Sequence, residues 1–284
     1  MIRQIPCMTK NTNEEYHKDD GFISASMLKN ILTSPKHYQY YISKTEEVKK
    51  HFVIGGAVHT LLLEPDRFNK TYYTICKKDL PCPDNMVTKT ENKEYIIEVE
   101  SKNIGKTRLT EAELTQSHDM VKSALGNDTV LNLLDSGVAE HSFYWVEDET
   151  GIRCKSRPDF VRDKGNVLVE IKTTKDASPF GFARECATYK YHIQAGFHSI
   201  GINAVRGGFP IQNVIIAIEN EPPYHVGVYY IPKIDIQQSI EKCKDALEIL
   251  RDCKQNNKYP GYEIHAENDK GIIELKLPQW LFDY

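Results

Sequence analysis

The chain has 284 residues, a mass of 32.6 kDa and a formal net charge of −4 at pH 7. Its length allows one large domain or two small ones, and its 40% hydrophobic and 27% charged residues are ordinary for a globular protein. The overall charge gives no sign of nucleic-acid binding, although acidic metal ligands could mask a local basic channel. The sequence shows no apolar run of transmembrane length and no signal-peptide core, so we expect an intracellular protein without membrane association.

Cysteine and glycine patterns exclude two kinds of cofactor site. The seven cysteines are odd in number and scattered, which is typical of free thiols in a reducing compartment. No C-x2-C pair occurs, so we expect neither a zinc site nor an iron–sulfur cluster. Gly105-Lys106-Thr107 imitates the end of a phosphate-binding loop, but Glu100 stands where that loop needs glycine. We therefore expect no ATP site.

The first elements predicted along the chain are helical. Residues 1–21 are polar and predicted to be poorly ordered, and residues 22–284 contain no linker long enough to divide them into two domains. A helix is predicted over 24–43, broken at Pro35, with Ser34 capping the second piece. Lys36 and Tyr38 belong to a basic and aromatic stretch that suits contact with nucleic acid. The tyrosines of this stretch, Tyr38, Tyr40 and Tyr41, could equally pack on the core.

A second helix is predicted from Gly55-Gly56 to Glu64, ending before Pro65. His59 lies on an apolar side of this helix, where a lone histidine is more often a core residue than a metal ligand. Further on, the sequence predicts a strand and three helices. They cover residues 71–77, 89–102, 110–126 (opened by a capping box) and 128–134.

Two neighbouring strands in the middle of the chain carry unusual charges. A strand over 139–147 leads into a strand that ends near 157–161, and a turn at 162–166 precedes a strand over 167–172. Glu170 and Lys172 interrupt the apolar run of this last strand and point to the same face. If the strands are paired, Asp159 converges on the same place.

Two carboxylates at one place repel each other unless a cation lies between them, and Mg²⁺ prefers such oxygen ligands. A protonated lysine beside them cannot bind metal, but it can steady an attacking water or bind phosphate. The alternative is an amphipathic edge strand with a surface ion pair, which leaves the apolar residues around it unexplained. Glu140 is either a further acidic ligand or a surface residue.

The remaining elements are a helical region, two strands, a long helix and a short C-terminal strand. The helical region follows a loop at 176–179 and carries a polar stripe formed by Tyr191, Gln194 and His198. The others are predicted over 214–219, 225–231, 234–256 and 272–280.

Six segments in this order resemble the PD-(D/E)XK nucleases, specifically the family of the phage and prophage exonuclease RecE. They are SASMLKNILTSPKHY, GGAVHTLLLEPDRF, EHSFYW, GIRCKSRPDFV, VLVEIKTT and YKYHIQAGFHS, and the ending LPQW fits as well. The resemblance covers about residues 22 to 281. It implies an α/β chain with a PD-(D/E)XK restriction-endonuclease-like fold, a central mixed β-sheet flanked by helices.

The resemblance also implies an activity and partners. The activity is Mg²⁺- or Mn²⁺-dependent, ATP-independent 5′→3′ degradation of one strand from double-stranded DNA ends, which exposes 3′ single strands for annealing-type recombination. The implied assembly is a ring-like homo-oligomer threaded by DNA, with a single-strand annealing protein of the RecT type as partner. A phage or prophage gene and the cytoplasm of a bacterial host are implied as well.

Site residues carry over by position. His59 matches the upstream metal-binding histidine, which reverses the interpretation as a core residue given above. Asp159 and Glu170 match the metal carboxylates, Ile171 offers a backbone carbonyl, and Lys172 matches the catalytic lysine. Gln194 matches the glutamine of the Q-x-x-x-Y motif, whose tyrosine is replaced here by His198. Further candidates are Glu140 as an acidic ligand, Tyr191 beside the glutamine, and Arg157 with Lys36 and Tyr38 for DNA contact.

Two alternatives remain open at this point. One is an endonuclease on the same fold, which linear and closed circular DNA would distinguish. The other is a non-catalytic subunit that binds DNA ends and recruits an annealing protein, although the full set of acidic residues and lysine disfavours it. The Cas4- and AddB-like branches carry a four-cysteine cluster that the cysteine spacing here does not supply.

Overall fold

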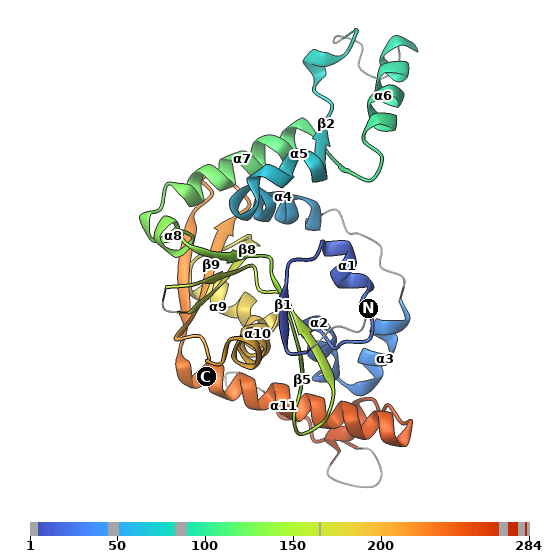
Figure 1. Ribbon diagram of the computed structural model, residues 1–284, viewed down its shortest axis with the longest axis vertical. Coiled ribbons are helices and arrows are strands. Elements are labelled where there is room, and N and C mark those ends of the chain that lie inside the picture. Colours follow the sequence, from blue (N-terminus) through green and yellow to red (C-terminus); the bar gives the residue numbers. More distant parts are fainter. Residues whose placement is uncertain are drawn as a thin grey trace.

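The computed structural model describes residues 5–44, 51–82, 90–164, 166–266, 272–277 and 282. It confirms the mixed α/β fold, in which a central mixed sheet is flanked by helices (Figure 1). The central sheet has five strands in the order β10-β9-β8-β7-β4, and β8 and β9 are its parallel pair. Its strands are β4 (Gly137–Ala139), β7 (Phe160–Arg162), β8 (Val167–Thr174), β9 (Gln212–Glu219) and β10 (Val226–Ile231).

Helices cover both faces of the central sheet because its strands are apolar on both sides. Val169 and Ile171 of β8 pack in one core against α4 (His51–Leu63), α7 (Glu111–Leu125) and α8 (Asp128–Leu133). Leu168 points the other way, into a core with α10 (Tyr191–Arg206) and α11 (Lys233–Asn256). The helix α9 (Pro179–Thr188) adds Phe182 to a smaller core on β9.

A second sheet of three strands lies beside the central one and packs against the N-terminal helices. Its order is β1-β5-β6, with β1 (Cys7–Thr9), β5 (Ser142–Val146) and β6 (Arg153–Ser156). The predicted helix break is confirmed: α2 (Ala25–Ile31) is capped by Ser24, and α3 (Pro35–Ser43) is capped by Ser34 with proline at its first turn.

The N-terminal segment differs from the expected poor order over the part that the structure describes. It contains β1 and the helix α1 (Asn13–Lys18). Thr12 and Glu15 form a capping box at the start of α1. Tyr16 is buried with Phe22 and Tyr144 in a small core. These contacts anchor the segment, although its composition is polar.

The strand predicted to end near 157–161 is in fact two strands, which belong to two different sheets. β6 ends at Ser156 and β7 begins at Phe160, and the chain passes between the sheets at Arg157-Pro158-Asp159. Pro158 has no backbone N–H to donate to a neighbouring strand, which explains why the strand is interrupted at this residue. The predicted strand over 139–147 is divided in the same way at Glu140, between β4 and β5.

An arm formed by residues 65–82 and 90–109 extends from α4, and α6 (Thr90–Lys102) stands away from the sheets (Figure 1). It contains the short helix α5 (Phe68–Thr71) and the parallel pair β2 (Tyr72–Thr74) and β3 (Thr107–Leu109). The expected strand at the C-terminus is wrong for residues 272–277, which form no strand. Pro278 and Trp280 lie outside the described residues. Short 3-10 turns occur at Pro65–Arg67, Lys77–Asp79 and Tyr262–His265.

Close packing of α10 on the second sheet requires glycine at position 201. A Cβ there would lie 2.6 Å from Trp145 Cζ3 and 2.7 Å from Ser156 Oγ. Alanine would favour the helix by about 1 kcal/mol, but overpacking of a core costs about 1–3 kcal/mol. We expect Gly201→Ala to lower the free energy of unfolding in urea by about 1 kcal/mol. Gly208→Ala is the control, since a Cβ there meets nothing within 4 Å, and equal midpoints for both variants would contradict the packing argument.

Candidate active site

Asp159 is the point at which side chains from several elements meet. It stands directly before β7, and its Oδ2 accepts a hydrogen bond of 2.7 Å from the backbone N–H of Ile171 in β8. Its Oδ1 lies 3.6 Å from Nδ1 of His59, and its Oδ2 lies 3.5 Å from Nζ of Lys172. The convergence predicted from strand parity is therefore present, although Asp159 lies between two strands rather than inside one.

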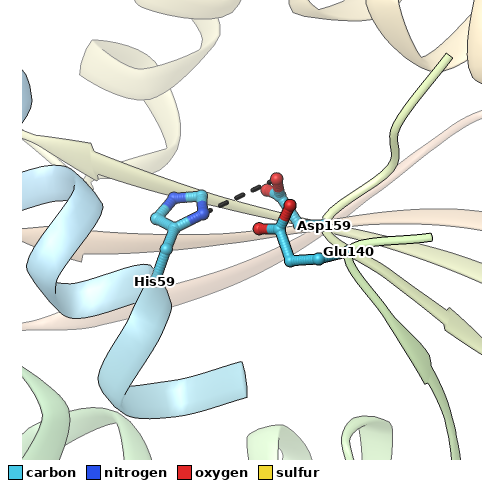
Figure 2. Close-up of side chains that lie close together, drawn as sticks. All are labelled: His59, Glu140 and Asp159. Atoms are coloured by element: carbon cyan, nitrogen blue, oxygen red, sulfur yellow. Dashed lines mark ion pairs between the residues drawn. The ribbon is translucent and has the colours of Figure 1, made fainter. Parts of the chain in front are cut away.

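His59 reaches this point because α4 lies close to the central sheet. A Cβ on Gly55 would lie 3.3 Å from Thr173 Oγ1 of β8, and a Cβ on Gly56 would lie 2.7 Å from the hydroxyl of Tyr72. The two glycines thus allow a close approach that larger residues would prevent. His59 follows one turn later and points toward Asp159 (Figure 2).

Glu140 completes a cluster of three potential metal ligands. One ligand atom each from His59, Glu140 and Asp159 lies within 4.8 Å of the others (Figure 2). Glu140 adopts a left-handed backbone conformation, with φ of 53°. Its N–H donates to the carbonyl of Asp159 and its carbonyl accepts from Nε of Arg157, both at 3.0 Å. These bonds hold the strained residue in place and aim its carboxylate at Asp159.

The cluster fits a divalent cation. Burial raises the pKa of Glu140 to about 8, and repulsion from the nearby Asp159 carboxylate adds to the rise. Two carboxylates this close to each other are unfavourable together unless a positive charge lies between them. Oxygen and imidazole ligands of this kind bind Mg²⁺ and Mn²⁺. The residues present are therefore suited to the ion that the resemblance implies.

Glu170, which is expected among the metal ligands, lies beside this cluster and is linked to Asp159 through Lys172. The residue is 2% exposed. Its Oε2 accepts from Nζ of Lys172 at 2.8 Å and from Nε2 of Gln194 at 2.9 Å, and its Oε1 lies 3.2 Å from Nδ1 of His198. The polar stripe expected on the helix over 191–198 is thus directed at the charged strand.

Glu170 and Lys172 on β8 each stabilise the ionised form of the other. Burial favours the neutral form of Glu170, but Lys172 and then His198 outweigh it and hold the pKa of that carboxyl well below its usual range. Burial likewise opposes the charge on Lys172, but Asp159 and Glu170 outweigh it and raise the pKa of the ammonium above its usual value. The site therefore contains a carboxylate and an ammonium at neutral pH.

The backbone of Ile171, whose carbonyl the resemblance implies as a metal ligand, lies on an edge of β8 that β7 does not cover. β7 pairs with β8 only as far as Val169, so the edge of β8 beyond it faces Asp159 rather than another strand. The N–H of Ile171 points to that edge, since it donates to Asp159. The N–H and C=O of one strand residue project to the same side. The carbonyl of Ile171 therefore also points toward the edge where Asp159 lies.

The candidates for DNA contact divide into three cases. The side chain of Arg157 is 6% exposed and binds the backbone of Glu140 and Asn11, so the protein itself uses its donors. Tyr38 is 5% exposed and stacks on Tyr259, which corrects its assignment to DNA contact in favour of the core alternative. Lys36 is exposed on α3. The structure gives no contact that would assign it a role.

Lys29 is a residue near the site that the sequence did not single out. It lies on α2, and its Nζ donates to Oε1 of Gln194 at 2.9 Å. Burial lowers the pKa of Lys29 to about 8, and repulsion from Lys172 adds to the change. The only sequence signal was its place in SASMLKN, one of the segments that carry the resemblance. Tyr191 stands beside both lysines, with its ring centre 5.6 Å from Nζ of Lys29 and 5.5 Å from Nζ of Lys172.

Cavities reach the site from two sides. One of about 620 Å³ is bordered by His59, Ile171 and Lys172, together with the arm. The other, of about 650 Å³, is bordered by Asp159, Gln194 and the N-terminal helices. Glu140 and Arg157 line both of them. Residues of the ligand cluster are therefore accessible from both cavities.

Residues 24–269 match the model of a family described as a PDDEXK-like domain of unknown function (DUF3799). The match includes each site residue described above and spans well over half of the chain. The chain belongs to this PDDEXK-like family. Membership in the PD-(D/E)XK group confirms the expectation from the sequence, whereas the RecE branch stays a prediction.

One solved structure with a TM-score above 0.5 supports the fold of this PDDEXK-like chain. A crystal structure from Eubacterium rectale, described as a "Putative exonuclease", has a TM-score of 0.62 at 13% identity, with 97% of this chain and 98% of that chain covered. A phage-related exonuclease from Haemophilus somnus 129PT has a TM-score of only 0.35 at 11% identity, with 71% of this chain and 94% of that chain covered. None of the curated proteins compared with the chain matches it. At these identities the likeness is one of fold alone.

Proposed function

We propose that the chain is a divalent-metal-dependent, ATP-independent exodeoxyribonuclease that degrades one strand 5′→3′ from the ends of linear double-stranded DNA. The observation that carries the proposal is the contact between the His59, Glu140 and Asp159 cluster and the Glu170–Lys172 pair, within the fold of a PDDEXK-like family. Exonuclease is chosen among the nuclease activities because of the RecE resemblance, and a structure with a similar fold over 97% of this chain is itself described as a "Putative exonuclease".

In this proposal His59 and Asp159 hold Mg²⁺ or Mn²⁺, with Glu140, Glu170 and the carbonyl of Ile171 as the further oxygen donors. An ion held by these residues would activate a water and would stabilise the leaving oxygen of the phosphodiester. Lys172, charged at neutral pH, orients the nucleophile or neutralises the charge that develops on the phosphate. Gln194 holds the Glu170 carboxylate, whose other oxygen faces His198 in the place of the motif tyrosine.

The wider role follows the RecE resemblance. We infer that the product is a 3′ single strand for annealing-type recombination, and that a RecT-type annealing protein receives it. A ring-like homo-oligomer around the DNA would keep the enzyme on its substrate without ATP. The setting would be the cytoplasm of a bacterium that carries the phage or prophage gene. Among the described residues no helix is long and apolar enough to cross a membrane.

A DNA digestion experiment tests the proposal against its two alternatives. Purified protein is incubated with linear and with covalently closed circular double-stranded DNA, in Mg²⁺ or in EDTA, and without ATP. We expect progressive loss of the linear DNA only, and only with Mg²⁺. Strand polarity is read from substrates labelled at the 5′ or the 3′ end. Cleavage of the circle would indicate an endonuclease, and end binding without cleavage would indicate a non-catalytic subunit.

A further inference from the structure

Gln194 has two hydrogen-bonding ends, and each one faces a charged group. Its Nε2 donates to the carboxylate of Glu170 at 2.9 Å, and its Oε1 accepts from Nζ of Lys29 at 2.9 Å. A carboxylate only accepts hydrogen bonds and an ammonium only donates them. Turning the amide over would set oxygen against oxygen and N–H against N–H. Both neighbours therefore favour the same orientation of the amide.

We propose that Lys29 is a positioning residue of the nuclease site, which acts by fixing the Gln194 amide so that it holds the Glu170 carboxylate. The inference rests on the proposed function, because it assigns a role in the same reaction. Among the described residues Lys29 forms no hydrogen bond or ion pair with His59, Glu140, Asp159 or Glu170, and its charge acts on Lys172 and Glu170 only at a distance. Its hydrogen bond to Gln194 is the contact through which we expect it to act.

The packing of α2 explains how Lys29 is held beside Gln194, which lies 165 positions later in the sequence. Leu28 and Ile31 of α2 are buried in a core that also contains Ile193 and Phe197 of α10. The two helices thus pack directly against each other, with Lys29 and Gln194 at their contact. The segment SASMLKN would in this way supply part of the active site from the N-terminal end of the chain.

A competing role for Lys29 is direct contact with a DNA phosphate, since the residue also lines the cavity of about 620 Å³. The two roles predict different kinetics. Loss of a phosphate contact weakens ground-state binding and raises KM, whereas a misplaced Gln194 lowers kcat. They also differ in additivity, because two residues that act through one contact do not contribute independent effects.

The test compares Lys29→Met, Gln194→Leu and the double variant on linear DNA with Mg²⁺, beside the wild type. We expect Lys29→Met to lower kcat about 10-fold, in the range seen for outer partners of metal ligands, with KM within about twofold. In the Gln194→Leu background the same substitution should change nothing further. Higher KM with unchanged kcat, or effects that multiply in the double variant, would overturn the proposal.

A control and a second measurement separate this role from a loss of structure. Lys190→Met removes another lysine that holds α2, since Nζ of Lys190 donates to Thr33 Oγ1 at 2.8 Å and to the carbonyl of Lys29 at 3.1 Å. The Lys190→Met variant should have the same kcat as the wild type. In metal-free protein labelled with ¹⁵N-glutamine, the side-chain amide signal of Gln194 should shift in Lys29→Met and stay in place in Lys190→Met. An unmoved signal in Lys29→Met would overturn the proposal even if the wild type lacked nuclease activity.

Discussion

Asp159→Asn is expected to abolish divalent-ion binding and to lower DNA cleavage by about 10³-fold, because the charge stabilisation that a bound ion provides is worth several kcal/mol. Asparagine keeps an oxygen that can accept the N–H of Ile171, so the junction between the strands should hold. It removes the charge that faces His59 and Lys172. Calorimetric titration with Mn²⁺ and initial rates on linear DNA measure the two effects.

The matched control is Asp163→Asn. Asp163 follows β7 and pairs at its surface with Arg206 at 3.3 Å. An exposed pair of this kind is worth at most about 1 kcal/mol. The control should therefore bind Mn²⁺ and cleave DNA like the wild type. Unchanged ion affinity in Asp159→Asn would remove this aspartate from the metal site, and cleavage at the wild-type rate would remove it from the reaction.

Lys172→Met is expected to lower cleavage by about 10³-fold while leaving Mn²⁺ binding in place. Its ammonium lies 2.8 Å from Glu170 and 3.5 Å from Asp159, and it cannot itself ligate an ion while charged. Loss of one partner of a buried ion pair also destabilises the fold, here by about 3–5 kcal/mol. Rates must therefore be measured well below the melting temperature, which is determined in the same buffer.

Lys175→Met serves as the control, since Lys175 lies just beyond β8 and is exposed. It should change neither rate nor stability appreciably. Lys172→Met would contradict the assignment if it kept wild-type rates with Mn²⁺ bound. If Lys172→Met stays folded but loses both Mn²⁺ binding and cleavage, the role of the lysine is to hold the metal ligands in place.

The central pairing and most of the helices were predictable because they follow from local patterns. Period-two alternation set Glu170 and Lys172 on one face, and Ser34 with Pro35 marked a helix start that the structure confirms. The capping box at Thr110 opens α7 as predicted. The contact of His59 with Asp159 required the resemblance, because no local pattern relates a helix residue to a strand 100 positions later.

Other features depended on contacts that the sequence does not encode locally. Glu140 joins His59 and Asp159 only because the chain changes sheets at that residue, with a backbone conformation that its residue type does not favour. Lys29 reaches Gln194 only because two helices pack together. Tyr38 was ambiguous from sequence, since a tyrosine on a helix suits both a core and a nucleic-acid surface.

The alternation of side chains along β8 means that one register of the strand places both the core residues and the charged residues of the site. Val169 and Ile171 fill the core under α4 and α7, while Glu170 and Lys172 carry the charges between them. Inserting or deleting one residue within the strand would exchange the two faces and lose both at once. The segment between β7 and β8 is where the spacing between the aspartate and the glutamate can change without shifting either strand. Related chains should vary in length there and keep their strands intact.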